Sequence, residues 1–354
     1  MLLSFQYHLG QYLRERYTGF LPETYDENDL YVRASDVDRT MMSALSNLAG
    51  LYPPKGDQVW NPELLWQPIP VHIVPLEDDN IIGSHFRCPK YTKLKSEIHS
   101  LPEIQNMVQE NQWVFDYLTQ HSGQNLTSLW DINYLYDTFF IEGIYKKTLP
   151  DWTKKVYPDK MQSMSAFSFK LNTYTHDMKR LRSGPMIQSI LDHFNGFIKK
   201  DHRRKLLMYS GHDTTVSALL DTLGMFDPPI PPPYASMVIM ELKKNAQNGD
   251  YFVNFAYRND SSRDPYDLTL FDCDLECPLS KVEALTEDLR PEDWKAECES
   301  NVDLTTKAVT LFSMAVAFVL AFILIVSVII ACVRSRCFLS EDMHTKDYKY
   351  FSIN

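Results

Sequence analysis

The sequence predicts an α/β protein with a helical cap and one C-terminal transmembrane helix. Short strand-like apolar runs alternate with helix-like segments, which is the order typical of a sheet covered by helices. Residues 91–182 hold helix formers and aromatic residues but no strand-like run of comparable strength, which indicates the cap. Residues 308–333 contain no charged residue, and at ~1.5 Å per residue they are long enough to cross a ~30 Å hydrocarbon core.

The segment before the cap predicts two helices and two strands. Residues 3–17 carry a mixed apolar face typical of a helix, and residues 30–32 read Leu-Tyr-Val, which predicts a short strand. A Ser-x-x-Asp pattern at residues 35–38 matches a capping box and places a helix over the apolar-rich residues 41–51. Residues 64–76 alternate in a strand-like way, which predicts a second strand.

The segment after the cap repeats this alternation. Residues 186–198 predict a helix, residues 205–209 a short buried strand, and residues 216–223 a helix that ends at a glycine. A Pro-rich turn then leads to two further strands over residues 235–242 and 251–257. The strands and helices on both sides of the cap together make one α/β core.

Charge bears on partners and on membrane orientation. The formal net charge of −11 argues against nucleic acid as a partner, because proteins that bind polyanions need a basic surface. Arg334 and Arg336 directly follow the apolar run, whereas only Lys307 lies close on its other side. The positive-inside rule therefore places residues 334–354 in the cytosol and residues 1–300 in the lumen or outside the cell, as a single-pass type I protein.

Two features suit a luminal body, and one does not. Asn125 and Asn259 stand in Asn-x-Ser/Thr triplets, which are glycosylation acceptors. The first eight residues have neither a basic region nor a sufficient apolar run, so they are not a signal peptide. A luminal glycoprotein without a signal peptide is inconsistent, and we therefore expect a truncation at the N-terminus.

Four cysteines precede the membrane segment, an even number that suits an oxidising compartment. Cys273 and Cys277 are too close in the chain to belong to two different bridges, so we expect a disulfide between them and another between Cys88 and Cys298. The alternative for Cys-x₃-Cys is half of a metal site, but no second His/Cys pair has matching spacing. The sequence therefore predicts disulfides and no metal ion.

The C-terminal tail carries two short patterns. Tyr350 and Ile353 bound a Tyr-x-x-hydrophobic pattern typical of sorting signals, which predicts sorting adaptors as partners. Cys332 and Cys337 lie at the membrane boundary, where palmitoylated cysteines and plain membrane-edge residues are both common.

Residues with chemical potential gather at two strand–loop–helix junctions. Arg33 ends the first predicted strand, and His212 and Asp213 follow residues 205–209. Because ligands of open α/β sheets bind at the carboxyl ends of strands, we expect these residues to meet. Arginine donates a planar fork of N–H groups to phosphate oxygens, and a protonated aspartate can donate to a leaving oxygen. Simpler roles stay open: Arg33 in a surface salt bridge and Asp213 as a helix cap.

Two longer segments around these residues resemble a known family. Residues 31–40 (Tyr-Val-Arg-Ala-Ser-Asp-Val-Asp-Arg-Thr) and 205–216 (Lys-Leu-Leu-Met-Tyr-Ser-Gly-His-Asp-Thr-Thr-Val) are similar to signature segments of the histidine acid phosphatases, in particular the lysosomal, prostatic and testicular group of animals. Shorter similar stretches are residues 47–54, 232–236, 257–259 and 291–294. The resemblance covers residues 7–298, followed by a membrane anchor as in the lysosomal and prostatic types.

The resemblance implies an acid phosphatase that hydrolyses phosphate monoesters through a phosphohistidine, without a metal or organic cofactor. It implies that Arg33 and His212 bind the phosphate and that Asp213 protonates the leaving alcohol. The implied fold is a three-layer core like that of the phosphoglycerate mutases, with a helical cap. The implied location is the lysosomal or plasma membrane, and the implied assembly is a homodimer.

The sequence also departs from the family. The family's nucleophilic histidine lies in an Arg-His-Gly segment on the first core strand, and no Arg-His-Gly occurs in the 354 residues. The expected truncation accounts for the missing nucleophile, first strand and signal peptide together. The alternative function is therefore a catalytically inactive, membrane-anchored protein that binds phosphate or a partner, or a truncated gene product.

Overall fold

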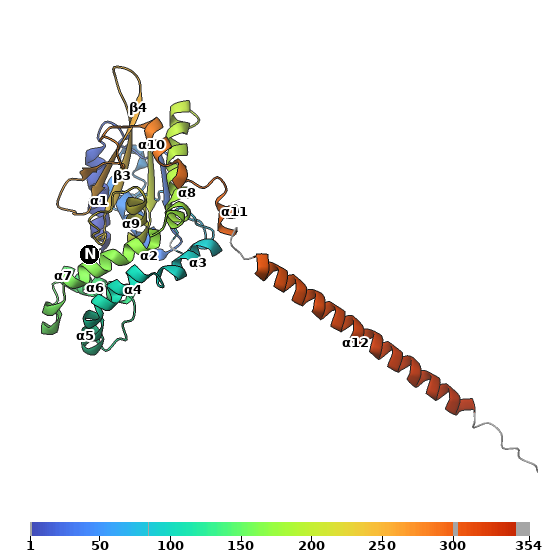
Figure 1. Cartoon of the computed structure of the whole chain (residues 1–354). Coiled ribbons are helices and arrows are strands. Elements are labelled where there is room, and N and C mark those ends of the chain that lie inside the picture. The colour runs from blue at the N-terminus through green and yellow to red at the C-terminus, as the bar shows by residue number, and fades with distance from the viewer. Residues whose placement is uncertain (1, 84, 300–303, 345–354) are drawn as a thin grey trace, which may run out of the picture. The chain divides into compact units, whose positions relative to one another are not determined.

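The computed structural model describes residues 2–83, 85–299 and 304–344 (Figure 1). The chain divides into two compact units, Met1–Glu299 and Ser300–Asn354. The described part of the first unit holds helices and two small sheets, and that of the second holds one long helix.

In the first unit, helices alternate with strands at both ends of the chain and follow one another in the middle. The helices are α1 (Leu2–Arg16), α2 (Asp38–Leu51), α3 (Pro89–Ile98), α4 (Pro102–Glu110), α5 (Gln112–Ser122), α6 (Leu129–Ile144), α7 (Asp159–Lys170), α8 (His176–Lys199), α9 (Asp213–Thr222), α10 (Leu279–Leu285) and α11 (Trp294–Glu299). The strands are β1 (Leu30–Ala34), β2 (Leu206–Ser210), β3 (Met237–Lys244), β4 (Tyr251–Arg258), β5 (Tyr266–Leu268) and β6 (Cys277–Pro278).

Both sheets lie between the same two layers of helices. β1 and β2 form a parallel pair, and β4 pairs in an antiparallel sense with β3, β5 and β6. Val32, Met208 and Met237 belong to a core shared with α1 and α2, whereas Tyr209 and Val238 belong to one shared with α8 and α9. Because neighbouring strand residues point to opposite faces, each sheet separates these two cores. This is the predicted three-layer α/β core.

The facing edges of the two sheets line one cavity. Within the described residues β2 pairs only with β1, and β3 only with β4. A cavity of about 1310 Å³ is lined by both strands and by side chains of α1, α2, α8 and α9. It extends to the loops that follow β1 and β2, which also contribute to its wall. The polar backbone of two sheet edges therefore faces the same space as those loops.

The register of β1 on β2 aligns the ends of both strands. Leu30 lies beside Leu206, and Ala34 beside Ser210. The pairing continues for one more residue, because the Ser35 amide donates to the Ser210 carbonyl at 3.2 Å. Within a few residues of these strand ends, the segment after β1 forms helix α2 and the segment after β2 forms helix α9.

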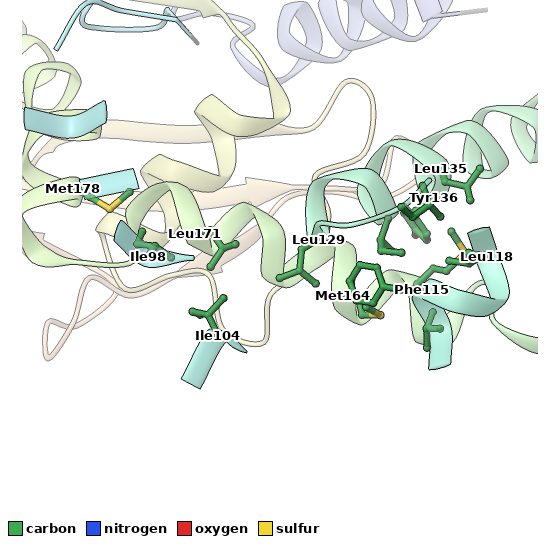
Figure 2. Packing of buried hydrophobic residues seen from close by; sticks show 14 of the residues in the cluster. Ile98, Ile104, Phe115, Leu118, Leu129, Leu135, Tyr136, Met164, Leu171 and Met178 are labelled. Atoms are coloured by element: carbon green, nitrogen blue, oxygen red, sulfur yellow. The ribbon is translucent and has the colours of Figure 1, made fainter. Parts of the chain in front are cut away.

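Helices α3 to α7 form the cap, and they pack around a hydrophobic core that also includes residues of α8 and α11 (Figure 2). Phe115 and Leu118 of α5 are fully buried against Ile132 of α6 and Met161 of α7. Ser128 begins α6 with a capping box to Asp131, which satisfies the free N–H groups of the first turn. The cap region therefore contains helices but, in its described part, no strand, as predicted.

The structure corrects two expectations about local elements. Residues 64–76 form no regular strand; His72 alone bridges β1, through hydrogen bonds with Val32 and Ala34. Prolines at positions 68 and 70 remove alternate N–H donors, which explains the loss of the ladder. The capping box at residues 35–38 is also absent, because the hydroxyl of Ser35 is used elsewhere and α2 begins at Asp38 without a side-chain cap.

Two further elements start earlier than expected. Helix α9 begins at Asp213 rather than at residue 216, and α8 begins ten residues before position 186, with Pro185 inside it. In both cases the structured segment is longer than its apolar run, because the first turn of a helix can carry polar residues.

The second unit holds α12 (Leu304–His344). Its segment Leu311–Arg334 is long and apolar enough to cross a membrane. The sorting pattern at Tyr350 and Ile353 lies outside the described residues.

Two disulfides close loops of very different length. Cys88 is joined to Cys298, 210 residues away, and Cys273 to Cys277, four residues away. These are the pairs that the sequence analysis expected. The first bond ties α11 to the start of α3 at the edge of the cap, whereas the second closes only the turn before β6.

The two bonds differ in their expected contribution to stability. Replacing Cys88 and Cys298 by serine should lower the free energy of unfolding by about 5 kcal/mol, and replacing Cys273 and Cys277 by about 2 kcal/mol, because loop-closure entropy grows with loop length. Denaturant unfolding of the two double variants, followed by tryptophan fluorescence, measures the difference. Equal losses would show that loop length does not govern these bonds.

Candidate active site

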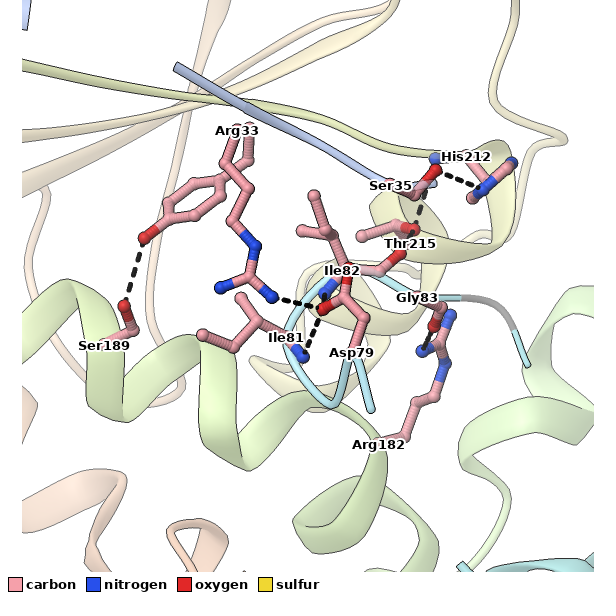
Figure 3. A network of polar contacts seen from close by, with 11 residues as sticks. Arg33, Ser35, Asp79, Ile81, Ile82, Gly83, Arg182, Ser189, His212 and Thr215 are labelled. Carbon is pink, nitrogen blue, oxygen red and sulfur yellow. Dashed lines mark hydrogen bonds and ion pairs between the residues drawn. The ribbon is translucent and has the colours of Figure 1, made fainter. Parts of the chain in front are cut away.

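The carboxyl ends of β1 and β2 bring three side chains together. Ser35 Oγ lies 2.9 Å from His212 Nε2, and Arg39 Nη2 lies 3.3 Å from His212 Nδ1. Ser35 follows β1, Arg39 is in the first turn of α2, and His212 directly precedes Asp213, the first residue of α9. Figure 3 shows the imidazole of His212 beside Ser35. The contacts of Ser35 and Arg39 with His212 therefore depend on the pairing of β1 with β2.

The hydrogen bonds fix the tautomer of His212. A guanidinium can only donate, so the bond from Arg39 requires Nδ1 of His212 to accept. The proton of the neutral ring is then on Nε2, which donates to Ser35 Oγ. The hydroxyl of Ser35 in turn meets Thr40 Oγ1 at 2.9 Å. The ring is thereby oriented with its accepting nitrogen toward Arg39.

His212 is uncharged in the free site. Burial lowers the pKa of His212 to about 4, and electrostatic interactions with Arg39, Arg182 and His85 contribute to the decrease. The carboxylate of Asp79 acts in the opposite direction and raises the pKa. An anion placed among these cations would reverse the balance and favour the imidazolium.

Asp213 lies at the N-terminus of α9 with its side chain open to the cavity. Surrounding protein atoms raise the pKa of Asp213 through burial, although the Thr214 amide, which donates to Oδ1 at 2.7 Å, lowers it. The carboxylate of Asp137 raises the pKa of Asp213 further, and Arg39 opposes that effect. The net result is a carboxyl group that stays protonated to higher pH than an ordinary aspartate.

Arg33 is directed away from His212. Its Nη2 donates to Asp79 Oδ1 at 2.6 Å, and the carboxyl of Asp79 is fully buried (Figure 3). The same oxygen of Asp79 accepts from the amides of Ile81 and Ile82 at 3.1 and 3.0 Å. Arg33 therefore holds a tight turn rather than lying beside His212, whereas Arg39 occupies the place expected for it.

The turn held by Arg33 supports the start of α9. The Ile82 carbonyl accepts from Thr215 Oγ1 at 3.2 Å, and Thr215 Oγ1 accepts from the His212 amide at 3.2 Å (Figure 3). Arg182, which is buried, donates to the carbonyl of the next residue, Gly83. Arg33 thus reaches the backbone of His212 indirectly, through a chain of hydrogen bonds.

Sequence reasoning missed Arg39, although the chain held a signal. A cation in the first turn of a helix opposes the helix dipole, and Arg39 is the second residue of α2. A residue that contradicts its local preference often marks a functional position. Asp79 carried no such signal, because it lies in an irregular turn far along the chain from Arg33.

The cap and the Pro-rich segment before β3 also contribute to the cavity. Tyr234 donates to both carboxylate oxygens of Asp137, at 3.1 and 3.2 Å. Burial raises the pKa of Tyr234, and the charges of Asp137 and Asp213 raise it further. Burial also raises the pKa of Asp137. These two residues lie near enough to Asp213 to share its electrostatic environment.

The remaining predicted positions are spread over the first unit. Asn125 is exposed in the loop between α5 and α6, whereas Asn259 is half-buried directly after β4 and lines the cavity. Within the described ranges no group of three or more His, Cys, Asp or Glu side chains is arranged to hold a metal ion.

Comparisons with known proteins identify related sequences and folds. Residues 5–258 match the family described as Histidine phosphatase superfamily (branch 2). The chain is 42% identical over 299 residues to the prostatic acid phosphatase of Bos taurus, covering 82% of this chain and 76% of that one. It is 38% identical over 337 residues to the lysosomal acid phosphatase of Rattus norvegicus, covering 93% and 78%.

Among solved structures the chain is similar to a Hafnia alvei phytase in complex with tartrate. The TM-score is 0.63 at 16% identity, and the match covers 84% of this chain and 87% of the other. A Citrobacter braakii phytase matches with a TM-score of 0.56, also at 16% identity, over 84% and 88%. At this identity the likeness concerns the fold.

Substitutions of Arg33 and Asp79 should have strongly non-additive effects on the free energy of unfolding. Asp79→Leu leaves a cation that is 11% exposed without its partner and should cost about 3–5 kcal/mol of unfolding free energy. Adding Arg33→Met removes that charge and should recover most of the loss. Denaturant midpoints of the two single variants and the double variant measure this coupling, and simple additivity of the two losses would contradict it.

Proposed function

The chain belongs to branch 2 of the histidine phosphatase superfamily, and from this membership we propose that Arg39, His212 and Asp213 bind a phosphate monoester and protonate its leaving alcohol. Its curated relatives are acid phosphatases, and enzymes of this superfamily act through a phosphohistidine. The contact of Arg39 with His212, at the cavity wall and next to Asp213, is the observation that carries the proposal.

The electrostatics of the site support an anion between Arg39 and His212. Burial and the neighbouring cations together hold the pKa of His212 at about 4. The cations repel a protonated ring, and a bound phosphoryl group would relieve that repulsion. The N-termini of α2 and α9 begin at the same level and supply free N–H groups, which favour phosphate. Guanidinium, imidazole and amide donors together match the three terminal oxygens of a monoester.

Asp213 is suited to the proton transfer. Its raised pKa keeps the carboxyl protonated at acid pH, where it can donate to the ester oxygen as the P–O bond breaks. Its side chain faces the cavity, so the leaving alcohol has space on that side. The proposal thus assigns the phosphoryl group to Arg39 and His212 and the leaving group to the side of Asp213.

Arg33 has a supporting role in this proposal. It maintains the turn from Asp79 to Gly83, which anchors Thr215 and the backbone of His212. The binding role that the family resemblance implied for Arg33 is therefore reassigned to Arg39.

No Arg-His-Gly sequence occurs in the 354 residues, so the proposal assigns no residue of this chain to the nucleophilic attack. That observation favours a second function, in which the chain binds a phosphorylated ligand without hydrolysing it. Turnover of an aryl phosphate at acid pH separates the two functions, because only the enzyme releases the alcohol. The phosphate-binding side of the site is common to both.

The cellular setting follows from the relatives and from α12. The lysosomal and prostatic relatives and the apolar segment Leu311–Arg334 fit a membrane-anchored luminal protein. We propose that residues 1–300 form the luminal or extracellular domain, with residues 91–182 as its cap and residues 334–354 in the cytosol. A homodimer and sorting adaptors that read the tail belong to the same proposal.

Arg39→Met should weaken the binding of inorganic phosphate by about 10- to 100-fold, because it removes charge-assisted hydrogen bonds. The double variant Arg33→Met with Asp79→Leu is the matched comparison: it loosens the turn that supports His212 but removes no phosphate ligand, so it should weaken binding less than Arg39→Met does. Isothermal titration calorimetry measures both. Similar losses in the two variants would refute the assignment of Arg39 over Arg33.

Anion binding should become tighter as the pH falls from 7 toward 4. Because the pKa of free His212 is about 4 and a bound anion raises it, the complex binds more protons than the free protein between these values. Affinity then rises with falling pH, by at most about tenfold per pH unit and proton. Sulfate is the suitable probe, because its own charge is constant over this range.

The control for the pH dependence is His212→Asn, which should flatten the profile. Protonation of Asp213, whose pKa is raised, acts in the same direction, so a residual slope should remain and should disappear in His212→Asn with Asp213→Asn. An affinity that is independent of pH in the native protein would contradict the proposed site.

A further inference from the structure

One face of α6 is turned toward the cavity near Asp213. Trp130, Asn133, Tyr134 and Asp137 are spaced three and four residues apart along the helix, and all line the cavity. Aromatic rings and one carboxylate therefore form the cap side of the same space into which Asp213 projects. In the proposed orientation of a monoester, this side receives the leaving group.

Asp137 is the charged group on that face. Tyr234, a neutral phenol, donates to both carboxylate oxygens of Asp137. Burial raises the pKa of Asp137, and no cation among the described residues opposes this increase. The charge of Arg39 lowers the pKa values of Asp213 and Tyr234, but Arg39 is not among the groups that shift the pKa of Asp137. A half-buried carboxylate that lacks a cationic partner attracts positive charge from a ligand.

Aromatic rings line the same cavity as this carboxylate. The ring of Tyr234 stacks on Phe140, with centroids 6.3 Å apart, and Phe140 stacks in the same way on Tyr136. Electron-rich ring faces beside a carboxylate are the surroundings in which ammonium groups are bound in proteins. The charge and the rings thus point to the same class of ligand group.

We propose that Asp137 is a specificity-determining residue that selects phosphate esters whose leaving group carries a positive charge, such as esters of amino alcohols. This inference rests on the proposed function, because it takes the phosphoryl group to be held by Arg39 and His212. The ester then spans the site, with its anionic end at the strand ends and its cationic end at the cap. Leaving groups that carry a carboxylate or a further phosphate are disfavoured by Asp137.

The bond between Asp137 and Tyr234 also joins the cap to the segment before β3, so a purely structural role has to be separated from selection. A structural role requires the hydrogen bond, whereas selection requires the negative charge. Tyr234→Phe removes the hydrogen bond and keeps the charge. Asp137→Asn removes the charge and keeps a group that can accept from the phenol.

Three phosphonates of matched length provide the test, and they cannot be hydrolysed. 3-Aminopropylphosphonate, butylphosphonate and 4-phosphonobutanoate differ in their terminal group, which is an ammonium, a methyl and a carboxylate. Calorimetric titration of the whole chain near pH 7 should give the tightest binding for the ammonium compound, about five- to tenfold over the methyl compound. The carboxylate compound should bind more weakly than the methyl compound.

In Asp137→Asn the preference for ammonium over methyl should fall to about one, while the affinity for inorganic phosphate stays within about twofold. Tyr234→Phe and the distant control Asp116→Asn, on α5, should keep the preference. Equal affinities of the three phosphonates for the native chain would overturn the inference without any variant. So would a preference that persists in Asp137→Asn.

Failure of the proposed function gives a different result. If inorganic phosphate does not bind, or binds equally well to Arg39→Met, the phosphoryl site itself is wrong. If phosphate binds at Arg39 but the three phosphonates are not distinguished, only the role of Asp137 is wrong. Asp137→Glu, which keeps the charge, should retain part of the preference and excludes a general loss of structure as the cause.

Discussion

The in-register parallel pairing of β1 with β2 is the constraint on which the site depends. It sets Ala34 beside Ser210, and the Ser35 amide extends the ladder by one hydrogen bond before the two strands diverge. Both strands therefore end side by side, and the helices that follow direct the N–H groups of their first turns toward the same part of the cavity. A slip of one residue would turn Ser35 to the other face of the sheet and break its contact with His212.

The local sequence was sufficient to locate the site at the strand ends, but not to tell which arginine lies beside His212. The two strands and the helix starts follow from short apolar runs and polar junctions, so His212 and Asp213 could be singled out with the junction that holds Arg33. Arg33 and Arg39 stand six residues apart in one segment, and each suits a phosphate. The two arginines differ in the structure because Arg33 donates to Asp79, which lies in a turn that the sequence pattern does not predict. The choice is made by a long-range contact that spacing along the chain does not encode.

The same limit explains the segment over residues 64–76. Its alternation is real, and His72 does reach β1, but Pro68 and Pro70 prevent a regular ladder. The irregular path continues into the turn at Asp79. A regular strand would carry the chain on in an extended form, whereas the turn lets Asp79 accept from Arg33 and from the two amides that follow.

The phosphoryl side and the leaving-group side of the cavity rest on different parts of the fold. Ser35, Arg39 and His212 are held by the β1–β2 pair and the turn at Asp79, with hydrogen bonds that do not involve β3 or the cap in the described structure. Asp137 and Tyr234 come from α6 and from the segment before β3. A change in the position of the cap would therefore alter the charge and the rings that meet a leaving group while the cations around His212 stay in place. Substrate preference can then vary through the cap without altering how the phosphate is held, because among the described residues no hydrogen bond joins the two sets of side chains. They are coupled through longer-range charge, by Arg39 acting on Tyr234 and by Asp137 and Arg39 acting on Asp213.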